Sequence, residues 1–127
     1  MKSSAAQHLN RAEHFLEVSS DLLKLGHNSD SISRSYYGAF HAVKAMLSEL
    51  DLQQKSHQAV WSAFAEHITN PGLIDRRFHQ DGWALFNRRM EADYMVDPEE
   101  TREDAEELLG FAKELVGACR TFLESRP

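Results

Sequence analysis

The sequence lacks the residues that build disulfide scaffolds, phosphate loops and metal centres. It has one cysteine, three prolines and six glycines among 127 residues, so no disulfide can form within the chain. No glutamate is followed by histidine three residues later, and there is no His-Glu-x-x-His, no Cys-x-x-Cys and no glycine-rich phosphate loop. These absences argue against a carboxylate-bridged di-metal bundle, a zinc protease and a P-loop nucleotide hydrolase. We therefore expect neither a metal ion nor another cofactor.

Long apolar runs are also missing. None approaches the roughly eighteen residues of a membrane span, and the first residues, MKSSAAQHLNRAEHF, lack the apolar block of a signal peptide. Cys119 stands among apolar neighbours and is expected to be a small core residue rather than a nucleophile. The sequence therefore predicts a cytoplasmic protein without a membrane partner.

Negative charge is concentrated near one end of the chain. The formal net charge is −6 at pH 7, and most of it belongs to residues 97–127. An acidic total argues against indiscriminate binding of nucleic acid. Because residues 1–96 are nearly neutral, a local basic site remains compatible with the composition.

Apolar residues recur at helical spacing through most of the chain, and no segment alternates as a strand would. The pattern predicts helices over about 4–25, 30–50, 56–68 and 75–92, and from 97 onward. The expected boundary signals are Gly26 as a stop, Ser29 or Asp30, Ser56 and Asp75 as caps, and Asp97 with Pro98 as a cap and first-turn pair. With no repeat or linker, residues 1–127 are interpreted as a single all-α domain. Its expected architecture is an antiparallel up-and-down four-helix bundle with a short fifth helix.

The expected second helix, DSISRSYYGAFHAVKAMLSEL at 30–50, has two contrasting faces. One is a wide apolar stripe made of Ile32, Tyr36, Ala39, Phe40, Val43, Met46, Leu47 and Leu50. Arg34 and His41 lie opposite, because residues seven apart are separated by two turns and by only about 20° in angle. Tyr37, Lys44 and Ser48 share their face. Gly38, Ala42 and Ala45 form a small-residue flank, which we interpret as the contact surface of a homodimer.

Arg34 and His41 are the residue types that metal-independent RNA cleavage requires. A neutral histidine can take the proton of a ribose 2′-hydroxyl near pH 7. A guanidinium stays charged and can bridge two phosphate oxygens. Tyr37 stands between them as a hydrogen-bond donor or stacking surface. The alternative is that these residues only supply the polar outer face that a bundle helix needs.

Two further groups carry candidate binding residues. Lys55 and His57 flank Ser56 at the start of the third helix, where an anion is favoured; the alternative is a capping serine with solvated neighbours. Arg89 is spaced for an ion pair with Asp93.

Tyr94 is expected to close the core through its hydroxyl. The alternative is that Arg89 and Tyr94 belong to a nucleotide or RNA surface. Arg76, Arg77 and Arg88 add charge to the same helix, so helices two and four are the expected place for a phosphate.

Three segments, SRSYYGAFHAVKAML, KSH at 55–57 and RMEADY at 89–94, resemble in this order the HEPN superfamily, in particular its small free-standing prokaryotic proteins. The resemblance implies an antiparallel helical bundle and a metal-independent endoribonuclease that works as a dimer. Such enzymes carry an Arg-x(4–6)-His motif, which corresponds here to Arg34 and His41. The family often has Asn, Asp or His directly after the arginine, where this chain has Ser35.

Similar proteins are often toxins whose antitoxin is a minimal nucleotidyltransferase. The leading hypothesis is therefore an RNA endonuclease with Arg34 and His41 as catalytic residues and a nucleotidyltransferase as partner. Its expected substrate- or nucleotide-binding residues are Tyr37, Lys55, His57, Arg89 and Tyr94. The alternatives are a non-catalytic module that binds nucleotide, RNA or a nucleotidyltransferase, and a purely structural dimerisation bundle.

Overall fold

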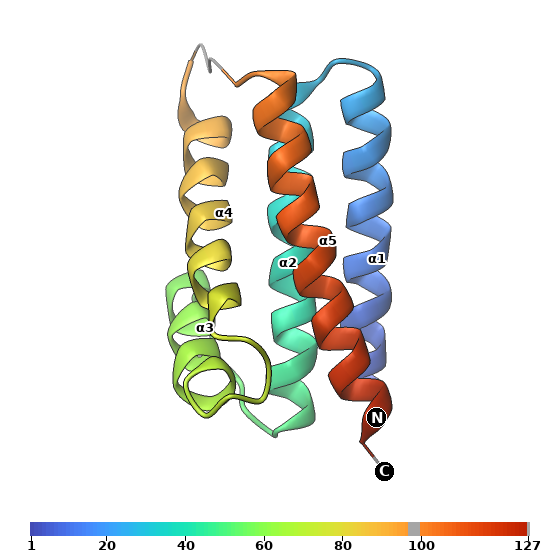
Figure 1. The fold of residues 1–127 in the computed structure, drawn as a ribbon, viewed down its shortest axis with the longest axis vertical. Coiled ribbons are helices and arrows are strands. Elements are labelled where there is room, and N and C mark those ends of the chain that lie inside the picture. Colours follow the sequence, from blue (N-terminus) through green and yellow to red (C-terminus); the bar gives the residue numbers. More distant parts are fainter. Residues whose placement is uncertain (97–99, 127) are drawn as a thin grey trace.

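The computed structural model describes residues 1–96 and 100–126, whose regular secondary structure is all helical, with no strand among these residues. The helices are α1 (Ser3–Lys24), α2 (Asn28–Glu49), α3 (His57–Phe64), α4 (Arg77–Tyr94) and α5 (Arg102–Ser125). A π-helical turn, Ala65–Thr69, continues α3. The four long helices run up and down, α3 and the π-helical turn lie in the connection between α2 and α4, and both termini lie at the same end (Figure 1). The predicted four-helix bundle with a short extra helix is confirmed.

Most of the predicted helix boundaries are correct. Ser56 caps α3 by accepting a hydrogen bond from the Ala59 amide at 3.0 Å. Asp75 accepts one from the Arg77 amide at 2.9 Å, although the N-cap residue of α4 is Arg76, one position later than predicted. Gly26 follows α1 with φ +82°, a backbone conformation that favours glycine.

Two boundaries differ. Ser29 and Asp30 do not cap α2, because the helix begins at Asn28 and its N-cap residue, His27, makes no side-chain hydrogen bond. The predicted pair Asp97 and Pro98 lies outside the described residues. Helix α5 begins after Thr101, whose hydroxyl accepts from the Asp104 amide while the Asp104 carboxylate accepts from the Thr101 amide.

Helix α2 is the centre of the bundle, with α1 and α4 on its two sides and α5 crossing in front of it (Figure 1). Almost every residue from Ser31 to Glu49 is buried. The half-buried exceptions recur every three or four residues and form one line, which we call the α2 strip: Arg34, Tyr37, His41, Lys44 and Ser48. The predicted polar face of the second helix is therefore its only open side among the described residues.

The small-residue flank of α2 lies inside the chain and not on its surface. Ala42 and Ala45 are completely buried. A Cβ atom placed on Gly38 would stand 2.9 Å from Cδ2 of Leu16, because α1 passes that close. The predicted dimer surface at these residues is wrong. Small residues permit close approach by any helix, and here that helix is α1.

Ser35 belongs to the interior between α1 and α2. Its hydroxyl lies 2.7 Å from that of Ser19, which also bonds Ser31. Ser19 and Ser35 are fully buried, and their hydroxyls satisfy one another. The residue after Arg34 therefore points away from the α2 strip and stabilises the helix pair.

Gly82, in the middle of α4, makes room for an indole ring. A Cβ atom there would overlap Cζ3 of Trp61. Trp61 is fully buried and donates a hydrogen bond to the Tyr36 hydroxyl at 3.0 Å, so the ring cannot simply swing aside. We expect Gly82→Ala to lower the free energy of unfolding by about 1–3 kcal/mol, as other overpacked cores do.

Urea denaturation measures this effect, and Gly110→Ala in α5 is the matched control. No atom lies within 4 Å of a Cβ at Gly110. Alanine there should raise the stability by about 0.5–1 kcal/mol, because it favours the helical backbone. An equal gain in stability from Gly82→Ala and Gly110→Ala would contradict the close packing of Trp61 against Gly82.

Candidate functional site

A second line of residues, from α1, runs beside the α2 strip. His8, Arg11 and Phe15 follow the same three-and-four spacing, in the opposite direction. His8 Nδ1 lies 3.1 Å from His41 Nδ1, and the two rings stack with their centroids 5.3 Å apart. The two helices therefore place a pair of histidines side by side.

Phe15 connects the two residues expected to act on phosphate. Its ring stacks on His41 with the centroids 5.5 Å apart. The Arg34 guanidinium carbon lies 5.6 Å from the Phe15 centroid and 5.2 Å from that of Tyr37. The Arg11 guanidinium lies over the same phenyl ring at 4.5 Å. Arg34 and His41 are thus held against one aromatic surface that also orients a second arginine.

Helix α4 contributes Arg89 to the far side of the α2 strip. Arg89 Nη2 donates to the Tyr37 hydroxyl at 2.6 Å, and its Nε lies 2.8 Å from the Asp93 carboxylate, as the spacing predicted. The guanidinium also lies 5.9 Å from the Tyr94 ring. Tyr94 itself is 69% exposed, so the prediction that it closes the core is wrong. It stands at the end of α4.

His57 is held in one tautomer by buried neighbours. Its ring stacks on Phe40 at 4.2 Å, and its Nδ1 lies 2.6 Å from the Tyr36 hydroxyl. Trp61 can only donate, so Tyr36 accepts from Trp61 and uses its own proton toward His57. Burial raises the pKa of Tyr36 to about 12, which keeps that proton in place. A neutral His57 therefore accepts at Nδ1 and carries its proton on Nε2.

The histidines of this surface are neutral at pH 7. Burial, together with the nearby His8, Arg11, Lys44 and His57, lowers the pKa of His41 to about 4. Burial, assisted by Lys44, lowers the pKa of His8. Burial, assisted by Arg89 and Lys44, lowers the pKa of His57. The contact between the Nδ1 atoms of His8 and His41 then has one proton, with one ring donating and the other accepting.

Most of the positive charge on this side of the molecule is not neutralised by acids; Arg89, which pairs with Asp93, is the exception. Among the described residues, no carboxylate forms an ion pair with Arg11, Arg34, Lys44 or Lys55. We call the surface formed by His8, Arg11, Phe15, the α2 strip, Lys55, His57 and Arg89 the basic surface. It exists in a chain whose net charge is −6.

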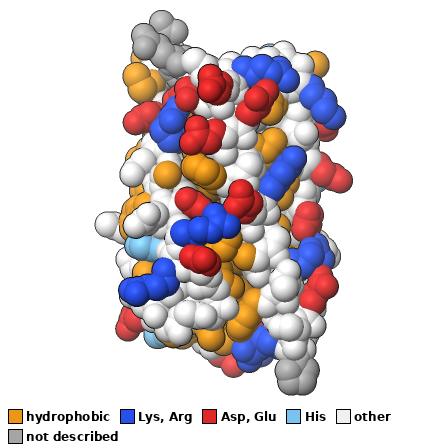
Figure 2. All heavy atoms as spheres, viewed as in Figure 1, with side chains coloured by type: hydrophobic (Ala, Val, Ile, Leu, Met, Phe, Trp, Pro, Cys, Tyr) orange, Lys and Arg blue, Asp and Glu red, His pale blue; other side chains and the backbone are white. Residues whose placement is uncertain are grey.

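The other side of the bundle is different. Around α5, Lys and Arg side chains are interspersed with Asp and Glu (Figure 2). Arg77 pairs with Asp81 and Glu114 there. Arg88 pairs with Glu91, Glu100 and Asp104.

The positive charge expected from helix four is therefore mostly cancelled, and Arg89 alone of these paired arginines reaches the basic surface. The remaining charge comes from α1, from α2 and from Lys55 in the loop before α3. Sequence reasoning missed His8, Arg11 and the position of Phe15, although their spacing in HLNRAEHF repeats that of Arg34, Tyr37 and His41.

Within residues 1–96 and 100–126, no three His, Cys, Asp or Glu side chains gather as a metal site would require. None of the described helices is long and apolar enough to cross a membrane.

We predict that an anion on the basic surface raises the pKa of His41. In the free protein the group titrates near pH 4 because burial and cations disfavour its charge. A phosphate within about 4–6 Å should raise the pKa by at least about one unit. NMR titration of the histidine signals, with and without inorganic phosphate, measures the shift; His67, beside Glu66 and away from this surface, is the internal reference.

The same lowered pKa makes stability depend on pH. An unfolded histidine has a pKa near 6.5, so between pH 6.5 and pH 4 the unfolded state binds more protons than the native state. The free energy of unfolding should therefore fall as the pH is lowered from 6.5 to 4, and it should recover when the pH is raised. His41→Asn should flatten that slope, whereas an unchanged slope would contradict the burial of a neutral His41.

Comparisons with known proteins agree with the fold and identify the family. The family model described as the HEPN domain matches residues 5–122. One relative, named "Putative toxin MJ0605" in Methanocaldococcus jannaschii, is 32% identical over 95 residues, which cover 75% of this chain and 70% of the relative. "Putative toxin MJ0142" of the same organism is 29% identical over 118 residues, covering 93% of this chain and 80% of the relative.

Two solved structures share the architecture. The crystal structure of TT1696 from Thermus thermophilus superposes with a TM-score of 0.82 at 16% identity, over 95% of this chain and 99% of the other. The crystal structure of ST0689, described as an archaeal HEPN homologue, superposes with a TM-score of 0.75 at 20% identity, over 95% of this chain and 98% of the other. These likenesses concern the fold. Because the HEPN model covers nearly the whole sequence, the chain belongs to the HEPN family.

Proposed function

We propose that this protein is a metal-independent RNA endonuclease of the HEPN type and the toxin of a toxin–antitoxin pair. The observation that carries the proposal is the basic surface itself. Arginines and lysines without carboxylate partners among the described residues surround neutral histidines on the open side of the central helix. Such a surface attracts the phosphodiester of an RNA and places a base near the 2′-hydroxyl of the adjoining ribose.

In the proposed reaction, His41 takes the proton of the ribose 2′-hydroxyl, and the leaving 5′-oxygen takes a proton from the solvent. With the roles exchanged, a protonated His41 gives its proton to the 5′-oxygen while the solvent takes that of the 2′-hydroxyl. The 2′-oxygen attacks phosphorus, and the bond from phosphorus to the 5′-oxygen breaks. The products are a 2′,3′-cyclic phosphate and a 5′-hydroxyl. Arg34 stabilises the charge that gathers on the phosphate oxygens. The phosphate in turn raises the pKa of His41 toward the range in which a histidine transfers protons effectively.

The experiment that tests this function is incubation of the purified protein with total RNA in the presence of EDTA. We expect cleavage that leaves 2′,3′-cyclic phosphate ends, identified by their resistance to ligation until the cyclic phosphate is opened and removed. Cleavage only when a divalent metal is added would rule out the proposed mechanism.

The proposed active form is a homodimer. One arginine and one histidine make a thin active site, whereas two basic surfaces brought around one cleft would supply two of each. The flank of Gly38, Ala42 and Ala45 is covered by α1 and does not provide the contact, so the dimer must use another surface.

The proposed biological partner is an antitoxin of the minimal nucleotidyltransferase type. Two relatives bear the name "Putative toxin", and this is what supports proposing that role for the present chain. A gene for a small nucleotidyltransferase beside this one, and a complex of the two proteins that no longer cleaves RNA, are the expected findings.

A second candidate function is a non-catalytic module that binds nucleotide or RNA. The low pKa of His41 favours it, since a histidine that titrates near pH 4 is a weak base at pH 7. This alternative predicts that RNA binds to the basic surface and is recovered intact. The cleavage assay therefore separates the two functions.

A further inference from the structure

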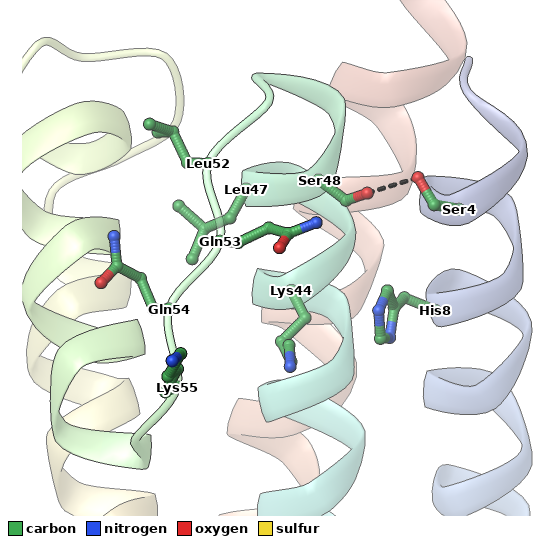
Figure 3. Close-up of a pocket in the computed structure, with 9 residues that line it drawn as sticks. All are labelled: Ser4, His8, Lys44, Leu47, Ser48, Leu52, Gln53, Gln54 and Lys55. Atoms are coloured by element: carbon green, nitrogen blue, oxygen red, sulfur yellow. Dashed lines mark hydrogen bonds between the residues drawn. The ribbon is translucent and has the colours of Figure 1, made fainter.

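A pocket of about 390 Å³ opens beside the histidine pair, between α1, α2 and the loop that joins α2 to α3 (Figure 3). Its size lies within the range of small-molecule sites. In Figure 3, His8 of α1 and Lys44 of α2 lie next to each other, and Gln53 reaches from the loop toward α2. Its polar lining includes Ser4, His8, Lys44, Ser48, Gln53 and Lys55.

We propose that this pocket binds the nucleotide next to the scissile phosphate, with Gln53 recognising the edge of its base. The inference deepens the proposed function and rests on it for the position of the scissile phosphate. It assigns a ligand class, a ribonucleoside monophosphate unit, to a pocket outside the Arg34–His41 pair.

The charge of the pocket suits an anionic ligand. Lys44 and Lys55 both line it, and none of its lining residues is acidic. The acid at its rim, Asp51, forms an ion pair with Lys2 and lines a smaller adjoining hollow. Two ammonium groups without carboxylate partners in the described part of the chain therefore face the space that a phosphate would occupy.

The remaining lining residues suit a nucleobase. The side-chain amide of Gln53 offers both donors and an acceptor, as the edge of a base does, and it makes no hydrogen bond to another described residue. Leu47 and Leu52 provide apolar contact area within the same pocket. Ser4 and Ser48 bond each other across its wall, which joins α1 to α2 at this point.

The pocket is continuous with the histidine pair. His8 lines it, and His8 Nδ1 lies 3.1 Å from His41 Nδ1. Lys44 belongs to the pocket and also to the α2 strip. A phosphate held by Lys44 in the pocket would thus lie next to His8, whose ring contacts His41, where the chemistry is proposed.

The binding test uses nucleoside monophosphates with each of the four bases, as both 3′ and 5′ isomers, and inorganic phosphate alone. Binding is followed in the NMR spectrum through the side-chain amide of Gln53 and the backbone of residues 51–56. We expect nucleotides to bind at least about tenfold more tightly than phosphate and to differ among bases. Gln53→Ala should remove the base preference. Gln53→Glu should weaken the binding of every nucleotide, because it adds negative charge to the pocket.

Gln80→Ala is the control, because Gln80 is exposed on α4 and does not line the pocket. Equal affinity for phosphate and nucleotides, or an unchanged base preference in Gln53→Ala, would overturn the proposal. These readouts do not require turnover. Nucleotide binding in the pocket without RNA cleavage would support the subsite and contradict the proposed nuclease. RNA cleavage without base-dependent binding would support the nuclease and contradict the subsite.

Discussion

Replacing His41 with alanine should lower the rate of RNA cleavage by at least about 100-fold, the usual contribution of a general acid or base. His41 lies on the α2 strip against Phe15 and His8, next to the cations that would hold a phosphate. His57 cannot take over its role through Nδ1, since that atom is occupied by the Tyr36 hydroxyl. Gel analysis of a defined RNA in EDTA, with rates measured at saturating protein, gives the comparison.

His67→Ala is the matched control for this variant. His67 lies in the π-helical turn after α3, where its partner is Glu66. The control should cleave at the wild-type rate, and both variants should show the helical circular dichroism of the wild type. Cleavage by His41→Ala at an undiminished rate would eliminate the proposed mechanism while leaving the fold untouched.

Replacing Arg34 with alanine should have an effect of similar size, about 100- to 1,000-fold, as expected for a group that stabilises charge in the transition state. Arg34→Lys should recover only part of the loss, because an ammonium cannot bridge two phosphate oxygens as a guanidinium does. Arg76→Ala, at an exposed arginine before α4, is the control and should leave the rate unchanged. Equal rates for Arg34→Ala and Arg76→Ala would remove Arg34 from the site.

The same two variants test whether the site is shared between copies. If each cleft takes residues from two chains, mixing Arg34→Ala with His41→Ala should restore measurable cleavage, because mixed dimers would contain one intact combination of arginine and histidine. Either variant alone would remain inactive. Failure of every mixture, with exchange of subunits verified, would mean that each chain carries its site alone.

The fold could be predicted because its signals are local. Spacing of apolar residues predicted the helices, and serine, aspartate and glycine marked several of their ends. The capping of α2 was not predictable from single residues. Ser29 and Asp30 are both common caps, and the chain simply enters the helix before them.

Half of the candidate site could be predicted as well. The spacing within α2 placed Arg34, Tyr37 and His41 on one face, and the structure leaves that face open. The partners that shape their chemistry come from elsewhere. His8 and Phe15, which were not predicted, reach it from α1. Arg89 and His57 were predicted as binding residues, but their contacts with the Tyr37 and Tyr36 hydroxyls could not be read from spacing.

By itself, then, the sequence determined which residues share a helix face, because the helical repeat depends only on neighbours in the chain. Only the tertiary structure decided which face each neighbouring helix covers. It turned the small flank of α2 inward against Leu16, left Tyr94 exposed, and paired Arg77 and Arg88 with acids, while Arg34 has no such partner among the described residues. These outcomes depend on packing between helices far apart in the sequence, which no local spacing contains.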